Sequence, residues 1–261
     1  MTEPRVTIAI DGGIADVRLA RPDKMNALDG AMFDGIVGAI ERLKHEPGLR
    51  AVVLSGEGRA FCAGLDMASM AAGGSGLSIG ERIDGLAIVP QQVAWGWRSL
   101  PVPVIAAVHG IAFGGGLQIA AGPDLTIVHP AARLSVMEVK WGIVPDMAGW
   151  ALWRGRVRDD VLRELAFTAR EFGGEEAVAL GFALRTAEDP HADAMALAHA
   201  IAARNPHAIR AVKRLANLAA DADPATILVQ ETEEQVKLLR SPNQIEAVMA
   251  NMQKRAPAFQ D

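Results

Sequence analysis

The chain contains no tyrosine and a single cysteine among its 261 residues. The lack of tyrosine excludes the Tyr-x-x-x-Lys pair with which short-chain dehydrogenases work. A lone cysteine, Cys62, excludes an intrachain disulfide and fits a reducing compartment. A catalytic thiol is one interpretation of Cys62, but no histidine motif accompanies it. We therefore expect Cys62 to be a small buried residue of a turn.

Long apolar runs and clustered positive charge are also missing. No apolar run approaches the about 20 residues of a membrane-spanning helix, and the first residues, MTEPRVTIAIDGG, hold no apolar core of signal-peptide length. The net charge is −5 and the basic residues are spread along the chain, whereas nucleic-acid-binding proteins carry a basic stripe. We expect a soluble cytoplasmic protein with neither nucleic-acid nor membrane partners.

Several common catalytic patterns are absent as well. Gly110 and the run Gly114–Gly116 do not have the G-x-G-x-x-G spacing of a dinucleotide fold. No G-x-S-x-G stretch marks a serine hydrolase, and the six histidines form no metal-ligand motif. The sequence thus predicts neither a nicotinamide cofactor, a nucleophilic serine nor a bound metal.

What is present is a strand, a glycine turn and a helix in the middle of the chain. Val102–Val108 is a short, β-branched apolar run that predicts a buried strand. Gly114–Gly116 then precede residues 117–121, which have helix-forming composition. Glycines at a helix start let a ligand approach unpaired backbone N–H groups, which favour negative charge. This turn is a candidate site for an oxyanion.

Two carboxylates, Glu138 and Asp146, follow this unit in the sequence. Carboxylates beside a polarised carbonyl group suggest proton transfer. The alternative is that the glycines only permit close helix packing and that both carboxylates are solvated side chains. Spacing alone does not choose between these interpretations.

Elsewhere the pattern predicts β-β-α-β order followed by helices. Residues 5–10 and 14–20 form a predicted hairpin, Asp29 is the expected N-cap of a helix ending near His45, and residues 51–54 form a strand. Residues 71–76 are the most flexible stretch by composition and are expected to be a mobile flap, and residues 181–184 a last strand. The expected helices span residues 78–99, 159–169, 175–180, 191–204, 207–220, 225–239 and 244–254. Composition divides the chain into an α/β core, residues 1–190, and a helical region, residues 191–261.

Four motifs carry a resemblance to a known family. Arg21–Leu28 resembles an R-P-x-x-x-N-A-L segment, Phe61–Asp66 an F-x-A-G-x-D turn, and Lys254–Phe259 a K-R-x-P-x-F ending, and the glycine-rich segment lies between them. In this order they resemble the crotonase superfamily of enoyl-CoA hydratases and isomerases. The resemblance implies a spiral of β-β-α turns with a C-terminal helical trimerisation region. It also implies a homotrimer or a dimer of trimers.

The resemblance assigns roles to individual residues. The family's oxyanion hole corresponds to the backbone N–H groups of Leu65 and Gly115; a packed turn residue is the alternative for Leu65. Glu138 matches a catalytic glutamate that hydratases and isomerases share; an ordinary surface glutamate is the alternative. The other hydratase glutamate is replaced by Gln118, which cannot act as acid or base but can orient water or substrate. We expect Glu138, Asp146 and Gln118 to be the catalytic side chains.

Asp146 stands where hydratases have glycine, and this resembles the dienoyl-CoA isomerases. Dehalogenases of the superfamily also place a nucleophilic aspartate there, so position alone does not decide. We expect an enzyme that shifts a double bond of an enoyl- or dienoyl-CoA through an enolate. The alternatives are an enoyl-CoA hydratase and a non-catalytic acyl-CoA-binding member.

The resemblance also predicts contacts with coenzyme A, which is part of the substrate, so that no separate cofactor is needed. Arg21 and Lys24 are candidates to face phosphate groups, and a solvated surface charge is the alternative for each. Asp66 is expected to stabilise its own turn as well. The predicted CoA-binding residues are Lys24, Asn26, Ala27, Leu28, Ala63, Asp66 and Lys254.

Overall fold

The computed structural model describes residues 4–71, 80–83 and 86–261. Apart from residue 71, the predicted flap at residues 71–76 lies outside the described residues. A short helix, α2 (Met67–Ala71), precedes that stretch. No described helix is long and apolar enough to cross a membrane.

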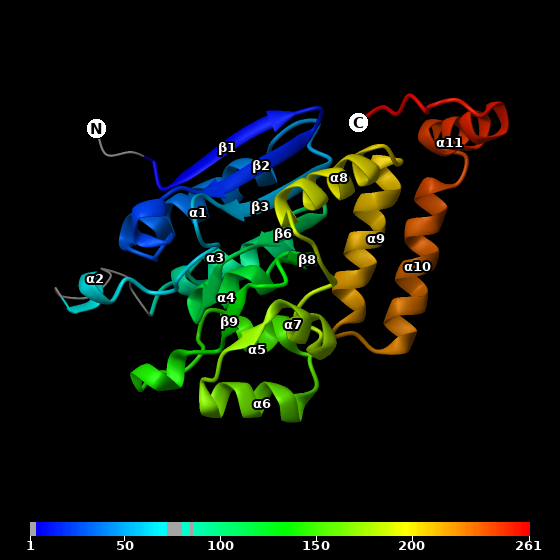
Figure 1. The fold of residues 1–261 in the computed structure, drawn as a ribbon. Helices are drawn as coiled ribbons and strands as arrows, with labels where there is room; N and C mark the ends of the chain where they lie inside the picture. The colour runs from blue at the N-terminus through cyan, green and yellow to red at the C-terminus, as the bar shows by residue number, and fades with distance from the viewer. Residues whose placement is uncertain (1–3, 72–79, 84–85) are drawn as a thin grey trace.

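The main sheet has six strands in the order β1-β2-β3-β6-β8-β11. β1 and β2 form the predicted antiparallel hairpin, and every later neighbour in the sheet is parallel. Figure 1 shows helices on both sides of this sheet. The strands are β1 (Val6–Asp11), β2 (Ile14–Leu19), β3 (Ala51–Gly56), β6 (Val104–Val108), β8 (Leu125–Val128) and β11 (Arg185–Thr186).

A second sheet of three strands, ordered β10-β9-β7, carries the chain toward the glycine turn. Its strands are β7 (Ile111–Phe113), β9 (Arg133–Ser135) and β10 (Phe172–Gly173), and a small pair is formed by β4 (Arg82–Ile83) and β5 (Ala87–Ile88). β7 follows β6 after a turn at Gly110, where φ is +63°. A Cβ there would lie 2.0 Å from the carbonyl oxygen of Arg59, so glycine is required at this crossing.

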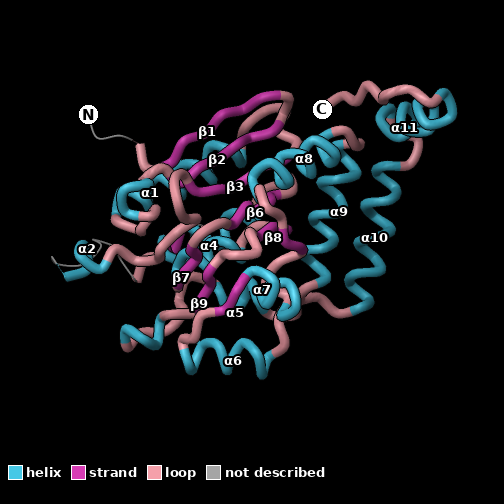
Figure 2. Tube along the Cα trace, in the orientation of Figure 1, coloured by secondary structure: helices cyan, strands magenta, loops and turns pink. Residues whose placement is uncertain are grey.

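The helices follow the predicted order, apart from two short helices that were not predicted, α2 and α5 (Gly149–Trp153). Figure 2 separates helices from strands by colour. Besides α2, the helices are α1 (Gly30–Lys44), α3 (Val89–Ser99), α4 (Gly115–Ala121), α5 (Gly149–Trp153), α6 (Asp159–Thr168), α7 (Gly174–Leu180), α8 (Pro190–Ala202), α9 (Pro206–Ala219), α10 (Pro224–Leu238) and α11 (Pro242–Gln253), with 3-10 turns η1 (Pro22–Lys24) and η2 (Glu138–Trp141). Asp29 caps α1 as predicted, since its side chain accepts a hydrogen bond from the Met32 N–H.

Two predicted elements are wrong in extent or place. The helix expected over residues 78–99 begins only at Val89, because Pro90 occupies the first turn and β4 and β5 precede it. The strand expected at 181–184 lies further on, as β11. Gly181 instead has φ +92° and ends α7, and its N–H donates to Val178 O.

Alternation along the central strands divides the core between the two faces of the sheet. Val52, Leu54 and Val104 face the larger cluster, which holds buried side chains of α1, α3 and α4. Val53 and Ile105 face the opposite side and pack against Ala194 and Ala198 of α8. α8 therefore covers the sheet, although it begins at the boundary predicted between core and helical region.

α9 is attached to the core by a buried lysine. Lys213 Nζ donates to Trp97 O and Val102 O and lies 2.9 Å from Asp124 Oδ2. α10 and α11 then extend away from the sheets (Figure 1). Their large exposed apolar side chains are Leu228, Val229, Val236, Ile245, Val248, Met249 and Met252.

Candidate active site

The glycine run places the start of α4 against the turn that contains Cys62. Gly114 has φ +50° and ψ −118°, a conformation open to glycine, and its N–H donates to Ser135 O. A Cβ on Gly116 would lie 2.3 Å from the carbonyl oxygen of Cys62. The Cys62 thiol is buried and donates to Asn26 O, as expected of a packed turn residue. Two segments far apart in sequence therefore meet at this turn.

The two predicted oxyanion donors face the same space. Leu65 and Gly115 both line one cavity, and the neighbouring Gly64 has φ +87°. A Cβ on Gly64 would lie 3.7 Å from the Gly115 nitrogen, so the turn and the start of α4 are in close contact. Neither the Leu65 N–H nor the Gly115 N–H donates a hydrogen bond to any residue that the structure describes. Both are free to donate to a ligand.

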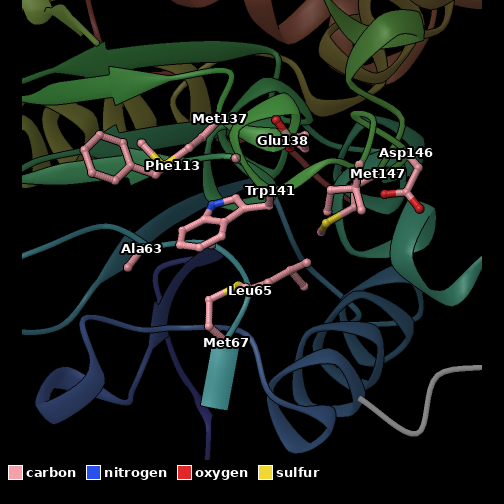
Figure 3. Close-up of a pocket in the computed structure, with 13 residues that line it drawn as sticks. Ala63, Leu65, Met67, Phe113, Met137, Glu138, Trp141, Asp146 and Met147 are labelled. Carbon is pink, nitrogen blue, oxygen red and sulfur yellow. The ribbon is translucent and has the colours of Figure 1, made fainter. Parts of the chain in front are cut away.

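The cavity has a volume of about 330 Å³ and a mainly apolar wall. Figure 3 shows Trp141 projecting across it, with Glu138 and Asp146 at separate points of the wall. Its lining residues are Ala63, Gly64, Leu65, Met67, Phe113, Gly114, Gly115, Met137, Glu138, Trp141, Ile143, Asp146 and Met147. An apolar wall with a few polar groups is typical of a small-molecule site.

The two carboxylate oxygens of Glu138 differ in their hydrogen bonding. Oε1 accepts a hydrogen bond of 2.6 Å from Gln118 Nε2. Oε2 is buried and has no hydrogen-bond partner among the described residues. Burial raises the pKa of the Glu138 carboxyl, and the negative charge of Asp146 raises this pKa further. A carboxylate of raised pKa with an unpaired oxygen in a cavity is suited to proton transfer.

Asp146 contributes a second carboxyl group from the segment between η2 and α5. The residue is exposed, yet it lines the same cavity as Glu138. Its partial removal from water raises the pKa of its carboxyl. The structure thus brings together two carboxyl groups and the two predicted N–H donors.

Gln118 does not reach this cavity wall. It is fully buried on α4, and its amide oxygen accepts hydrogen bonds from the Met147 N–H and the Gly149 N–H, at 2.9 and 3.0 Å. With the bond to Glu138, both ends of the amide are occupied. Gln118 therefore stands behind Glu138, and the sequence-based expectation that it contacts substrate or water directly is not supported by its position.

The predicted CoA-binding loop, residues 21–28, is built around a buried asparagine. The Asn26 side chain accepts from the Arg21 N–H and donates to Glu57 O and Ala60 O. Leu28 is also buried, and its N–H donates to Gly64 O. The side chains of Asn26 and Leu28 are therefore occupied in shaping the loop and the turn, and are not available to a ligand.

The charged residues of the CoA prediction differ in exposure. Arg21 is paired with Asp66 and donates to Ala27 O, so it stabilises the loop rather than facing phosphate. Asp66 also accepts from the Ala68 N–H, which supports its expected role in its own turn. Lys24 and Lys254 are exposed. Lys254 follows α11, which Figure 1 places on the opposite side of the molecule from α2. Ala27 is buried and Ala63 lines the cavity.

Sequence reasoning missed two parts of this site. The first is the apolar part of the cavity wall that lies outside η2, in particular Met67, Phe113 and Met147. The second is the pair of backbone donors to Gln118, at Met147 and Gly149. Backbone donors leave no trace in side-chain identity. The apolar residues next to Glu138 were the one available signal for the wall.

Comparison with known proteins places this site in a family. The sequence model described as enoyl-CoA hydratase/isomerase matches residues 9–261. A probable enoyl-CoA hydratase of Rhodobacter capsulatus is 33% identical over 99% of both chains. A probable enoyl-CoA hydratase of Mycobacterium tuberculosis is 33% identical over 87% of this chain and 86% of its own.

More distant relatives agree with this. The methylglutaconyl-CoA hydratase of mouse is 28% identical over 95% of this chain and 79% of its own. The crystal structure of an enoyl-CoA hydratase from Mycobacterium tuberculosis superimposes with a TM-score of 0.86 at 29% identity, over 99% of both chains. The α/β fold is therefore the crotonase fold, and the chain belongs to the enoyl-CoA hydratase/isomerase family of acyl-CoA enzymes.

Proposed function

We propose that this enzyme shifts the double bond of an enoyl- or dienoyl-CoA, with Glu138 and Asp146 as its two proton-transferring groups. The observation that carries the proposal is the presence of two carboxyl groups of raised pKa on one apolar cavity wall, together with two unpaired backbone N–H groups. Coenzyme A belongs to the substrate in this proposal, and no further cofactor is needed.

The reaction begins with removal of a proton from a carbon next to the thioester or conjugated with it. One carboxylate accepts this proton, and the electron pair moves onto the thioester oxygen as an enolate. The N–H groups of Leu65 and Gly115 stabilise that charge; loss of one such donor typically costs about 10²–10³ in rate. The other carboxyl group then gives a proton to a distant carbon as the double bonds rearrange.

The two carboxyl groups exchange protonation states in each turnover. Asp146 is exposed, so solvent protons reset the pair. The Asp146 charge raises the pKa of Glu138, so the protonation of the two groups is linked. In this proposal one group acts as the base while the other acts as the acid.

Hydration of a 2-enoyl-CoA is the second candidate, because the relatives named above are called hydratases. Water addition with two glutamates requires a second acid or base where this chain has Gln118. Gln118 is an amide, and its hydrogen-bonding groups are already occupied. We therefore favour isomerisation. A non-catalytic acyl-CoA-binding role is the third candidate and leaves the unpaired Oε2 of Glu138 without a purpose.

The test offers a 2-enoyl-CoA and a 3,5-dienoyl-CoA separately in deuterated water, with mass spectrometry and ultraviolet absorbance as readouts. Isomerisation of the diene with deuterium uptake but no added water supports the proposal. Efficient hydration of the enoyl substrate refutes it in favour of a hydratase. If neither substrate reacts and both still bind, the non-catalytic role is favoured. Glu138→Gln is the matched control for each reaction.

We further propose that the protein is a homotrimer or a dimer of trimers in the cytoplasm. The support is the set of exposed apolar side chains on α10 and α11, such as Val229, Val236 and Met252. Apolar patches of this kind on an extended helical region suggest an interface. A monomer in light scattering would contradict the proposal.

A further inference from the structure

Gln118 connects the two segments that carry the carboxyl groups of the cavity. Its Nε2 donates to Oε1 of Glu138, at one end of η2. Its Oε1 accepts from the N–H of Met147, the residue directly after Asp146, and from the N–H of Gly149 at the start of α5. One side chain therefore touches both parts of the active-site wall.

The amide of Gln118 is closely enclosed by the protein. Gln118 has no exposed surface, and a Cβ on Gly149 would lie 2.8 Å from its Oε1. Ala148, between the two donor residues, has φ +69°, a left-handed conformation that is unfavourable for a non-glycine residue. This backbone conformation presents the Met147 and Gly149 N–H groups to a single oxygen. Buried polar groups that are all satisfied hold one arrangement in place.

We infer that Gln118 is a positioning residue that fixes the Glu138 carboxyl relative to the Asp146 segment and leaves Oε2 of Glu138 as its reacting oxygen. The amide carries no charge, and its N–H can only donate toward Glu138. It therefore favours the ionised, proton-accepting form of that carboxyl. Among the described ionisable groups, Asp146 is the one whose charge acts on Glu138, and Lys140 of the same turn is exposed.

The inference rests on the proposed role of Glu138 in proton transfer. It also predicts a specific effect of placing a glutamate at position 118. A glutamate there keeps an acceptor for the Met147 and Gly149 N–H groups. Its other oxygen, however, takes the place of Nε2, 2.6 Å from Oε1 of Glu138. Two carboxylates this close share one proton and titrate as a pair. Gln118→Glu thus preserves the packing and replaces the neutral amide donor with an ionisable group that competes with Glu138 for one proton.

The experiment measures Gln118→Glu, Gln118→Leu and the control Thr126→Val. Thr126 is a buried residue whose hydroxyl donates to Ala120 O at the end of α4, so the control removes a nearby hydrogen bond without touching Glu138. Carbon-13 spectra of the Glu138 carboxyl, assigned by its absence in Glu138→Gln, give the titration of that group. Deuterium exchange of the α-protons of a saturated acyl-CoA gives enolate formation.

We expect the Glu138 titration and the acidic limb of the exchange rate, where the rate rises as Glu138 ionises, to move to higher pH in Gln118→Glu and Gln118→Leu, and to stay unchanged in Thr126→Val. Exchange at neutral pH should fall by about 10²-fold, the lower range for a general base. Unchanged titration in Gln118→Glu would overturn the inference. Exchange that is absent from the unaltered enzyme, while the Glu138 titration still moves in Gln118→Glu, would refute the proposed function and leave the positioning role intact.

Discussion

Arg21 Nη1 lies 2.8 Å from Oδ2 of Asp66, and both side chains are nearly buried. The pair joins the loop of residues 21–28 to the turn that presents the Leu65 N–H. Burial of Asp66 opposes its ionisation, but hydrogen bonds from Arg21 and from the Ser69 and Ala68 N–H groups outweigh this and lower the pKa of Asp66. The geometry of the oxyanion donor thus depends on an ion pair outside the cavity.

Asp66→Asn should weaken this connection. The loss of a hydrogen bond between charged groups is expected to lower the free energy of unfolding by about 1–3 kcal/mol. Misplacement of the Leu65 N–H should also reduce kcat/KM, by up to about 10²-fold. Chemical denaturation and steady-state kinetics measure the two effects. Asp34→Asn, an exposed substitution on α1, is the control. Equal behaviour of the two variants would show that the pair does not position the turn.

Glu138→Gln should reduce turnover by about 10²–10⁴-fold, because the amide cannot accept the substrate proton. The same change should raise the free energy of unfolding at pH values above about 4.3, the ordinary pKa of a glutamate. Burial raises the pKa of Glu138 in the folded state, so ionisation costs more in the fold than in the unfolded chain. The free energy of unfolding of the unaltered protein therefore falls as pH rises from about 4.3 through the raised pKa.

Thermal unfolding at several pH values checks this sign. The difference between Glu138→Gln and the unaltered protein should grow with pH through that window and be small below it. A variant that is less stable than the unaltered protein at neutral pH would show that the Glu138 carboxylate is not penalised by burial.

Gly115→Ala should mainly reduce activity, whereas Gly116→Ala should mainly reduce stability. A Cβ on Gly115 would lie 2.7 Å from Met147 Sδ, and a methionine side chain can move, so the main expected effect is loss of activity through a crowded oxyanion site. A Cβ on Gly116 meets the backbone of Cys62, which cannot move, and Gly116→Ala should destabilise the whole fold. Kinetics and thermal unfolding of both variants make the comparison.

Gly38→Ala provides the reference for these glycine changes. Gly38 is exposed on α1, and a Cβ there meets nothing within 4 Å. Alanine should therefore raise the free energy of unfolding by about 0.5–1 kcal/mol and leave activity unchanged. A destabilised Gly38→Ala would indicate that alanine substitution itself, and not the close contact, explains the other two variants.

Lys213→Met should destabilise the protein strongly. It removes the donor to Trp97 O and Val102 O and leaves Asp124 without its cation, and breaking a buried pair in this way typically costs about 3–5 kcal/mol. Lys237→Met removes an exposed lysine from Glu234, which keeps its pair with Arg214, and should cost about 0–1 kcal/mol. Urea denaturation of both variants tests the difference.

Elements whose signals lie close together in the sequence were predicted correctly, whereas elements that depend on distant residues were not. The Asp29 cap and the first hairpin were predictable because their signals lie within a few residues of the element. The start of α3 at Val89 was missed, since the residues before it continue an apolar pattern while pairing as β4 and β5. Local composition cannot distinguish those outcomes.

The candidate site also has parts that the sequence indicated and parts that it did not. Glu138 and Asp146 were predicted from the family resemblance, because their side chains are visible in the sequence, and the structure places both on one cavity wall. The occupation of Gln118 was not, because its partners at Glu138, Met147 and Gly149 lie far along the chain and two of them are backbone groups. The hydrogen bonds that occupy Asn26 were hidden for the same reason, since Glu57 and Ala60 offer only carbonyl oxygens.

The thiol of Cys62 can report local opening of the structure around the oxyanion turn. It is the only thiol in the chain, it is fully buried between the loop of Asn26 and the start of α4, and burial raises its pKa to about 12. Reagents that modify thiolates therefore react only when these segments separate. The rate of labelling at low denaturant would measure how often the scaffold of the oxyanion turn opens, and a ligand held by that turn should slow it.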